Sequence, residues 1–455
     1  MVARLSIEPI QWIVLSLFGI GFFLVAPLSR SVKEFFHATD EKGTQPGLFV
    51  LTGSLVISWI FAKSITNAAN LGQEFGIVGG IAYSLYYLSF MVAGWIIYDL
   101  RTKGGFKSIH QFLQLRYGKQ AVIVFSLLIT FRLFNEVWSN TMVIGSYFGS
   151  DNSASYYSAI LIFTFFTLAY TLKGGLRSSL LTDAVQMIFF SVLLVILLAF
   201  ILPTSSTTAM DFVKSGSWTF SGGLNLIGVV LIQIFSYPFH DSVMTDRGFI
   251  TNPKLTLKSF LLAGIIGIVC IFAFSLIGVY AKLEGIVGNP SVKVASLFGL
   301  GILLSMNLIM VTSAASTLDS AFSSFSKLMV MDIGKTHHKT VNNGRITMIL
   351  MAILGSIPVF LNPEILSATT ISGTMVLGLA PIFIFWKLKV PKSSYFISVS
   401  IGLIMGTLLA LGLFPKMLIF TEGRYSDLFS SNLIGTLLCF IGFFLPYVFS
   451  KVRNN

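Results

Sequence analysis

The sequence predicts an all-α membrane protein with 13 transmembrane helices, ten of which form a core of two inverted five-helix repeats. Three observations support this: the composition, the distribution of basic residues, and two predicted spans that turn polar midway. The chain has 455 residues, of which 55% are hydrophobic and 11% are charged, and its mean hydropathy is +0.84. Many apolar runs are long enough to cross about 30 Å of hydrocarbon, which is typical of a multi-pass integral membrane protein.

We predict one transmembrane transporter domain over residues 1–455. The predicted spans are 9–28, 48–72, 75–98, 120–147, 154–172, 179–203, 222–245, 259–281, 294–326, 346–362, 364–386, 394–414 and 430–450. They divide into an extra N-terminal helix (9–28), a first repeat (48–203), a second repeat (222–386) and C-terminal helices (394–455).

The basic residues support this topology. With the N-terminus outside, 22 of the 30 Lys and Arg residues fall in cytoplasmic loops and 6 fall outside, while Lys63 and Arg132 lie within spans. One miscounted span would reverse every later loop, so the asymmetry favours 13 spans with the C-terminus in the cytoplasm of an inner or plasma membrane. The net charge of +12 then reflects topology, and we expect lipid headgroups rather than nucleic acid as its partner.

Other functional classes find little support in the sequence. No nucleotide-binding loop, Ser/His/Asp set or metal-ligand cluster is visible, so we expect neither ATP-driven transport nor an enzyme. No cleavable signal peptide and no obligate protein partner are evident. Cys270 and Cys439 lie within spans and are interpreted as small core residues.

Two predicted spans are interrupted. Span 48–72 turns polar from Lys63 onward, and Asn67, Asn70 and Gly72 offer this helix an exit. In span 222–245, Pro238 removes a backbone donor and should unwind the helix.

Each interrupted span opens a set of five spans. Because five is odd, the second set enters the membrane in the opposite sense, which fits an inverted repeat with a binding site between the two breaks. The alternative is that Pro238 is an ordinary kink and that residues 63–70 line a helix interface.

The stretch Val311–Lys327 carries eight hydroxyl side chains and one carboxylate at the end of an apolar segment. Positions 313, 316, 317 and 320 follow helical spacing and share one face. Oxygen ligands without nitrogen or sulfur suit a hard cation such as Na⁺. Alternatively, these hydroxyls merely bond helix to helix.

Charged side chains inside a membrane are functional by default. Those within or beside the predicted spans are Lys63, Arg132, Glu136, Asp183, Asp319, His240 and Asp241. Arg132 and Glu136, four residues apart, can pair either as a structural lock or as part of a solute cavity. Asp183 either belongs to a site or caps its helix. Lys63 is expected to occupy the cation site itself, to pair with Asp319 or Asp183, or to carry protons.

Several motifs resemble the sodium:solute symporter family over Val32 to Lys389. They are K-E-F-F (33–36), K-G-G-L-R-S-S-L-L-T-D-A-V-Q (173–186), T-D-R-G-F-I-T-N-P-K (245–254), S-A-A-S-T-L-D-S-A (313–321), M-D-I (331–333) and F-W-K (385–387). The resemblance implies the leucine-transporter fold and Na⁺ as the coupling ion.

The resemblance also implies sites. Carried across by motif, the Na⁺ ligands are the carbonyl groups of Ala62, Ile65 and Ser313 and the hydroxyls of Ser316 and Thr317. A second ion or proton site would involve Lys63, Asp183, Asp319 and Ser320, where we expect a Lys63–carboxylate pair in place of a second Na⁺. The implied solute-binding residues are Ser64, Thr66, Asn67, Tyr87, Arg132, Asn135, Glu136, Tyr237 and His240.

We therefore expect Na⁺-coupled symport of a small polar organic solute by alternating access. The alternatives are an H⁺-coupled symporter that uses Lys63, Asp183 or Asp319, and a transporter-like sensor.

Overall fold

The computed structural model describes residues 7–201, 208–334, 339–361 and 367–454, and the regular structure in these ranges is helical. The first ten helices are α1 (Ile7–Val25), α2 (Val32–His37), α3 (Leu48–Trp59), α4 (Ala62–Phe75), α5 (Ile77–Ser84), α6 (Leu88–Thr102), α7 (Ile109–Tyr117), α8 (Lys119–Phe148), α9 (Ala154–Ile201) and α10 (Ala209–Lys214). The others are α11 (Asn225–Gln233), α12 (Ser242–Arg247), α13 (Pro253–Leu283), α14 (Pro290–Leu297), α15 (Leu300–Lys327), α16 (Val341–Ser356), α17 (Ser367–Met375), α18 (Leu379–Ile384), α19 (Lys392–Ala410) and α20 (Ser426–Asn454).

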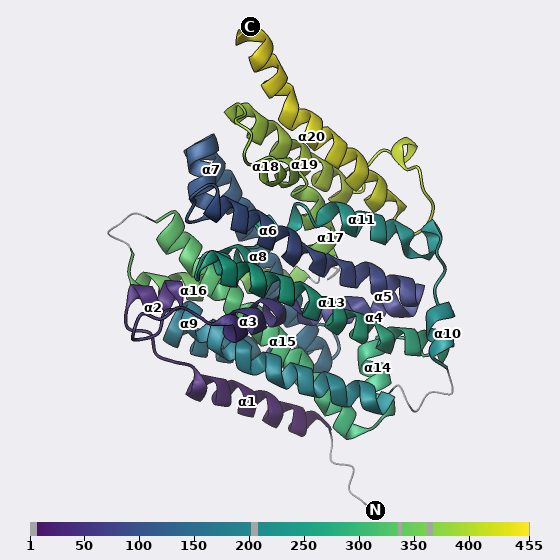
Figure 1. The fold of residues 1–455 in the computed structure, drawn as a ribbon. Coiled ribbons are helices and arrows are strands. Elements are labelled where there is room, and N and C mark those ends of the chain that lie inside the picture. The colour runs from purple at the N-terminus through teal and green to yellow at the C-terminus, as the bar shows by residue number, and fades with distance from the viewer. Residues whose placement is uncertain (1–6, 202–207, 335–338, 362–366, 455) are drawn as a thin grey trace, which may run out of the picture.

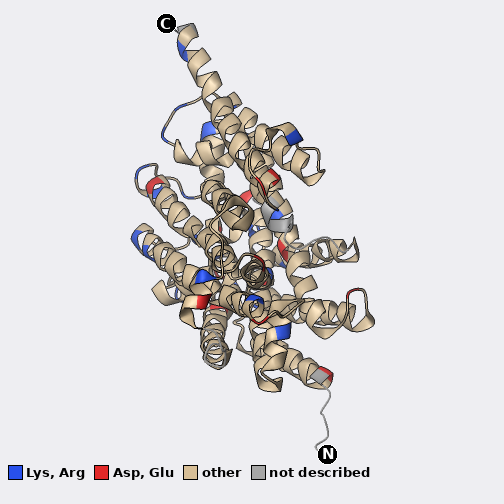
Figure 2. Ribbon diagram, turned by 90° about the vertical axis from the view of Figure 1, so that its right-hand side faces the viewer, with Lys and Arg blue, Asp and Glu red and all other residues tan. Residues whose placement is uncertain are grey.

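The helices form a core flanked on two sides. Figure 1 shows α1 along one edge and α19 and α20 along the opposite edge, with α3, α4, α13 and α15 between them. Only 22% of the apolar windows of α1 and α20 is buried, as expected of helices whose apolar faces meet lipid. Figure 2 shows how few charged residues interrupt the apolar helices.

Nine described helices are long and apolar enough to cross a membrane, and the bent pair α3–α4 makes ten. The predicted 13 spans are consistent with this if α9 counts twice and two pairs of shorter helices, α11–α12 and α17–α18, each cross once. The start of the predicted span 364–386 lies outside the described residues. The number 13 and the orientation of the termini remain predictions.

The long helix α9 reverses direction near Gly175. This residue has φ 58°, a left-handed conformation that glycine adopts without strain. The Ser178 hydroxyl donates to the Tyr170 carbonyl oxygen, eight residues earlier, at 3.1 Å. A straight helix would separate those residues by about 12 Å, so α9 contains the two predicted spans 154–172 and 179–203, of which residues 202 and 203 are not described.

Both predicted interruptions are present. Helices α3 and α4 meet at a bend of 58°, with Ile60 and Phe61 between them. The expected exit at Asn67–Gly72 is wrong, because α4 runs unbroken from Ala62 to Phe75. The second break lies where Pro238 predicts it: α11 ends at Gln233, a 3₁₀ turn covers Tyr237–His240, and α12 follows.

Helices α4 and α13 pack closely because small residues face each other. A Cβ on Gly278 would overlap the carbonyl oxygen of Ala69. Close backbone approach of this kind is how membrane helices gain packing energy.

We expect Gly278→Ala to lower the free energy of unfolding by about 1–3 kcal/mol through overpacking. The measurement is the midpoint of thermal unfolding in detergent. Gly301→Ala on α15 is the control, since its Cβ would meet no atom within 4 Å. Equal midpoints for the two variants would contradict the close approach.

Candidate functional site

The hydroxyl-rich face of α15 lies against the first helix break. The Ser313 hydroxyl donates to the carbonyl oxygen of Ile60, one of the two residues that separate α3 from α4. All five predicted Na⁺ ligands are at most 2% exposed, and none of their side chains faces lipid. They are Ala62, Ile65, Ser313, Ser316 and Thr317.

The two hydroxyls predicted as Na⁺ ligands donate their protons within the protein. Ser316 donates its proton to Asp183 Oδ1, and Thr317 donates its proton to the Ser313 carbonyl oxygen at 3.0 Å. A hydroxyl has one proton and two lone pairs, so both oxygens keep lone pairs available. Hard oxygen donors of this kind fit Na⁺.

A guanidinium group occupies the polar cluster next to these hydroxyls. Arg247, from α12, is fully buried, and its Nη2 lies 3.1 Å from Asp183 Oδ2. It also donates to Ser54 at 2.7 Å and to Ser320 at 2.8 Å. One side chain thus joins α3, α9, α12 and α15.

The carboxylates of this cluster differ in their partners. Asp183 lies inside α9 and accepts hydrogen bonds from Ser54 at 2.5 Å and Ser58 at 3.1 Å, so it is not a helix cap. Asp319 accepts from Ser179 at 2.6 Å and Tyr170 at 2.7 Å. Among the described residues no basic group forms an ion pair with Asp319.

The expected pairing of Lys63 with Asp183 or Asp319 is wrong. Its Nζ lies 2.8 Å from Glu136 Oε1, because Lys63 follows the first break and faces α8. Glu136 also pairs with Arg132, as their spacing predicts, and Arg132 Nη2 lies 3.3 Å from Asp241 Oδ2. These four side chains, at most 4% exposed, form an ionic network that links both breaks; we call it the break network.

A small cavity lies beside the break network. Its volume is about 20 Å³, roughly the space of one water molecule. The lining residues are Trp59, Phe61, Ser64, Tyr83, Tyr86, Tyr87 and Tyr237. The cavity is therefore too small for an organic solute in this conformation.

The nine predicted solute-binding residues divide into four groups. Ser64, Tyr87 and Tyr237 line the cavity, and Arg132 and Glu136 belong to the break network. Asn67 and His240 contact the cavity wall: Asn67 donates to Tyr83 Oη at 3.2 Å, and the His240 ring lies 4.8 Å from that of Tyr237.

The other two do not line the cavity. Thr66 donates to the Ala62 carbonyl oxygen within α4, and Asn135 accepts from Trp138 within α8. Their assignment to the solute site has no support from this geometry.

The sequence did not point to Arg247 or to four aromatic residues that line the cavity. Trp59, Phe61, Tyr83 and Tyr86 carry no charge, and nothing in their spacing marks them. Arg247 was placed in a cytoplasmic loop, because it falls two residues beyond the predicted span 222–245.

One ion pair lies near each end of α13. Near its beginning, Lys327 Nζ lies 2.7 Å from Asp246 Oδ1, which joins α15 to α12. Near its end, Arg424 pairs with Glu74 at 2.6 Å. Helix α13 has 31 residues and spans about 46 Å, so the two ion pairs lie far apart, near opposite ends of this helix.

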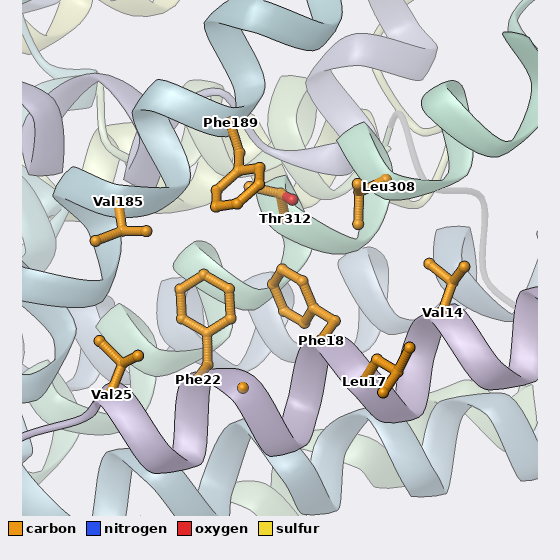
Figure 3. Close-up of a pocket in the computed structure, with 10 residues that line it drawn as sticks. Val14, Leu17, Phe18, Phe22, Val25, Val185, Phe189, Leu308 and Thr312 are labelled. Carbon is orange, nitrogen blue, oxygen red and sulfur yellow. The ribbon is translucent and has the colours of Figure 1, made fainter. Parts of the chain in front are cut away.

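A larger cavity of about 410 Å³ lies elsewhere, between α1, α9 and α15. Figure 3 shows Phe18 and Phe22 of α1 pointing across it toward Phe189 and Thr312. Its lining is apolar apart from Thr312, so it is no candidate for the polar solute site.

A model of the sodium:solute symporter family matches residues 43–215. The resemblance to this family is confirmed. The chain is 25% identical over 276 residues to the urea active transporter of Saccharomyces cerevisiae, covering 52% of this chain and 36% of that protein. It is 27% identical over 165 residues to sodium/glucose cotransporter 1 of Mus musculus, covering 32% of this chain and 24% of that protein. The matched segments thus span about a third or less of these relatives.

Solved structures extend the likeness to the whole chain. A Na⁺-coupled sialic acid symporter in a substrate-bound outward-open state superposes with a TM-score of 0.70 at 15% identity, covering 97% of this chain and 98% of that chain. A nucleobase-cation-symport-1 family transporter in a closed conformation gives 0.55 at 12% identity, covering 91% and 94%. The chain therefore has the leucine-transporter fold that the family resemblance implied.

Proposed function

We propose that this chain is a secondary-active transporter that couples Na⁺ entry to symport of a small polar organic solute. The observation that carries the proposal is the geometry of Ser316 and Thr317. They follow Ser313, which contacts Ile60 at the first break, and their protons are donated to other acceptors, which leaves oxygen lone pairs for a cation.

The residues give this proposal a mechanism. Na⁺, when bound, supplies a positive charge between α15 and the broken helix α3–α4. The carbonyl groups of Ala62, Ile65 and Ser313 and the two hydroxyls hold it there. Because these ligands come from α4, directly after the break, and from α15, binding favours a conformation in which the two helices are close together.

Alternating access requires one side of the site to open while the other is closed. We infer that Arg424–Glu74 opens to admit solute and ion while Lys327–Asp246 stays closed, and that the order then reverses. The exposed Arg424–Glu74 pair is the weaker of the two, since solvent screens it.

The comparisons support this proposal without fixing the solute. The structural neighbour of highest TM-score reported above is a Na⁺-coupled symporter of sialic acid, and one relative is a sodium/glucose cotransporter. Another relative is a urea active transporter.

One observation favours H⁺ coupling as a second candidate. Asp319 is fully buried, and hydroxyl groups are its hydrogen-bond partners among the described residues. A carboxyl group in such surroundings can exchange a proton during transport.

Uptake into vesicles reconstituted with the purified protein tests both candidates. We expect solute accumulation to require an inward Na⁺ gradient and to continue when the pH gradient is collapsed with an ionophore. Accumulation that follows the pH gradient and ignores Na⁺ would contradict Na⁺ coupling and support a role for Asp319.

A further inference from the structure

We propose that the solute carries no net charge and offers hydrogen-bond donors beside an apolar face. This inference rests on the proposed transport function and specifies the substrate class of the same cavity. It rests on the balanced charges of the break network and on the aromatic rings of the cavity lining, two of which already contact the protein's own cations.

The cavity wall presents no formal charge. Six of its seven lining residues are aromatic, and the seventh is Ser64. Their polar groups are hydroxyls and the Trp59 indole N–H, which is bonded to Asp241. Tyr83 Oη donates to Ser64 at 3.3 Å, and Tyr86 Oη donates to Gln233 at 2.8 Å. Such a wall suits a solute that combines hydroxyl or amide groups with an apolar face.

The charges beside the cavity balance among themselves. Two cations, Lys63 and Arg132, meet two anions, Glu136 and Asp241, through direct ion pairs. Asp241 gains a further hydrogen bond from Trp59 Nε1 at 2.8 Å. An ionised solute would add one uncompensated charge to this buried and balanced group, which is costly in a membrane interior.

A cationic solute meets a second obstacle. Aromatic rings attract cations through their faces, but the protein's own cations already occupy two of them. Lys63 Nζ lies 5.0 Å from the centre of the Phe61 ring, and Arg132 lies 5.0 Å from that of Tyr237. A further cation there would be repelled by both side chains.

An anionic solute would have to displace a carboxylate. Arg132 is already bound to Glu136 and Asp241, and Lys63 is bound to Glu136. Breaking the Arg132–Asp241 pair leaves Asp241, a buried carboxylate, without its counter-charge, which costs more than an exposed ion pair gains.

His240 indicates what the solute should donate. Its Nδ1 lies 2.5 Å from the Tyr237 carbonyl oxygen, so that nitrogen holds the proton and Nε2 is an acceptor. Among the described residues Nε2 has no hydrogen-bond partner. His240 packs against Tyr237, a lining residue, and an N–H or O–H group of a solute that reached Nε2 would satisfy it.

Two matched sets of solutes test the charge class. The first is acetamide, acetamidinium and acetate; the second is glucose, protonated glucosamine and glucuronate. Uptake of each radiolabelled compound is measured in vesicles of the full chain, with and without an inward Na⁺ gradient. We expect the uncharged member of at least one set to exceed both ions by at least about ten-fold, which corresponds to about 1.4 kcal/mol. Preferred uptake of an ion in either set would overturn the inference.

A pair of variants tests the cause. Glu136→Gln leaves the break network with one excess positive charge, and we expect uptake to shift toward acetate or glucuronate. Lys63→Met with Glu136→Gln removes one charge of each sign and should restore preference for the uncharged member. If the single variant does not insert, the neutral double variant and the native chain still give the ranking. An unchanged ranking in an inserted single variant would show that the network does not select charge.

The readouts separate this inference from the proposed function. The ranking by charge tests the solute class whether or not Na⁺ drives uptake. The Na⁺ gradient tests coupling whichever solute is taken up.

Discussion

Replacing Ser316 and Thr317 together by alanine is expected to abolish the dependence of uptake on Na⁺. The double variant removes two of the five proposed ligand oxygens and leaves the three carbonyl groups, which cannot complete a cation site alone. Mutating a residue that only hydrogen-bonds to a metal ligand commonly lowers the metal affinity by about 10–100-fold. Removing the ligands themselves should cost at least as much. We therefore expect the Na⁺ concentration for half-maximal uptake to rise by at least about 100-fold.

Ser323→Ala is the matched control for this prediction. Ser323 lies on the same helix and is buried, but its hydroxyl donates to the Ser320 carbonyl oxygen within α15. The control should keep the native Na⁺ dependence. If the double variant also keeps it while inserting normally, the cation site on α15 is wrong.

Replacing Arg247 by methionine is expected to destabilise the protein more than any other single change considered. The guanidinium group is fully buried and is the ion-pair partner of Asp183. Removing one partner of a buried pair leaves an uncompensated charge and typically costs about 3–5 kcal/mol. The expected result is a large fall in the thermal midpoint in detergent.

Two further variants isolate the cause. Asp183→Asn combined with Arg247→Met removes both charges and should recover much of the lost stability, because neither charge is left alone. Arg424→Met breaks an ion pair in which Arg424 is 63% exposed and Glu74 is 32% exposed, and should cost less than about 1 kcal/mol. A similar small loss for Arg247→Met would show that its charge is not needed by the cluster.

The sequence predicted the position of one helix break correctly and that of the other incorrectly. Pro238 correctly marked the second break, because proline acts on its own helix. The first break was placed too late, after Asn67. It lies at Ile60 and Phe61, where the Ile60 carbonyl oxygen accepts a hydrogen bond from Ser313 on a distant helix. Local propensity could not reveal that partner.

The sequence by itself determined the membrane class, the hydroxyl face of α15, the Arg132–Glu136 pair and the resemblance to sodium:solute symporters. Hydropathy, helical spacing and motifs are properties of residues close together in the sequence, so they can be recognised without knowledge of the fold. The tertiary structure decided the partners: Lys63 with Glu136, and Arg247 with Asp183. A buried charge pairs with whichever counter-charge packing brings within about 4 Å, and that depends on contacts between helices far apart in the chain.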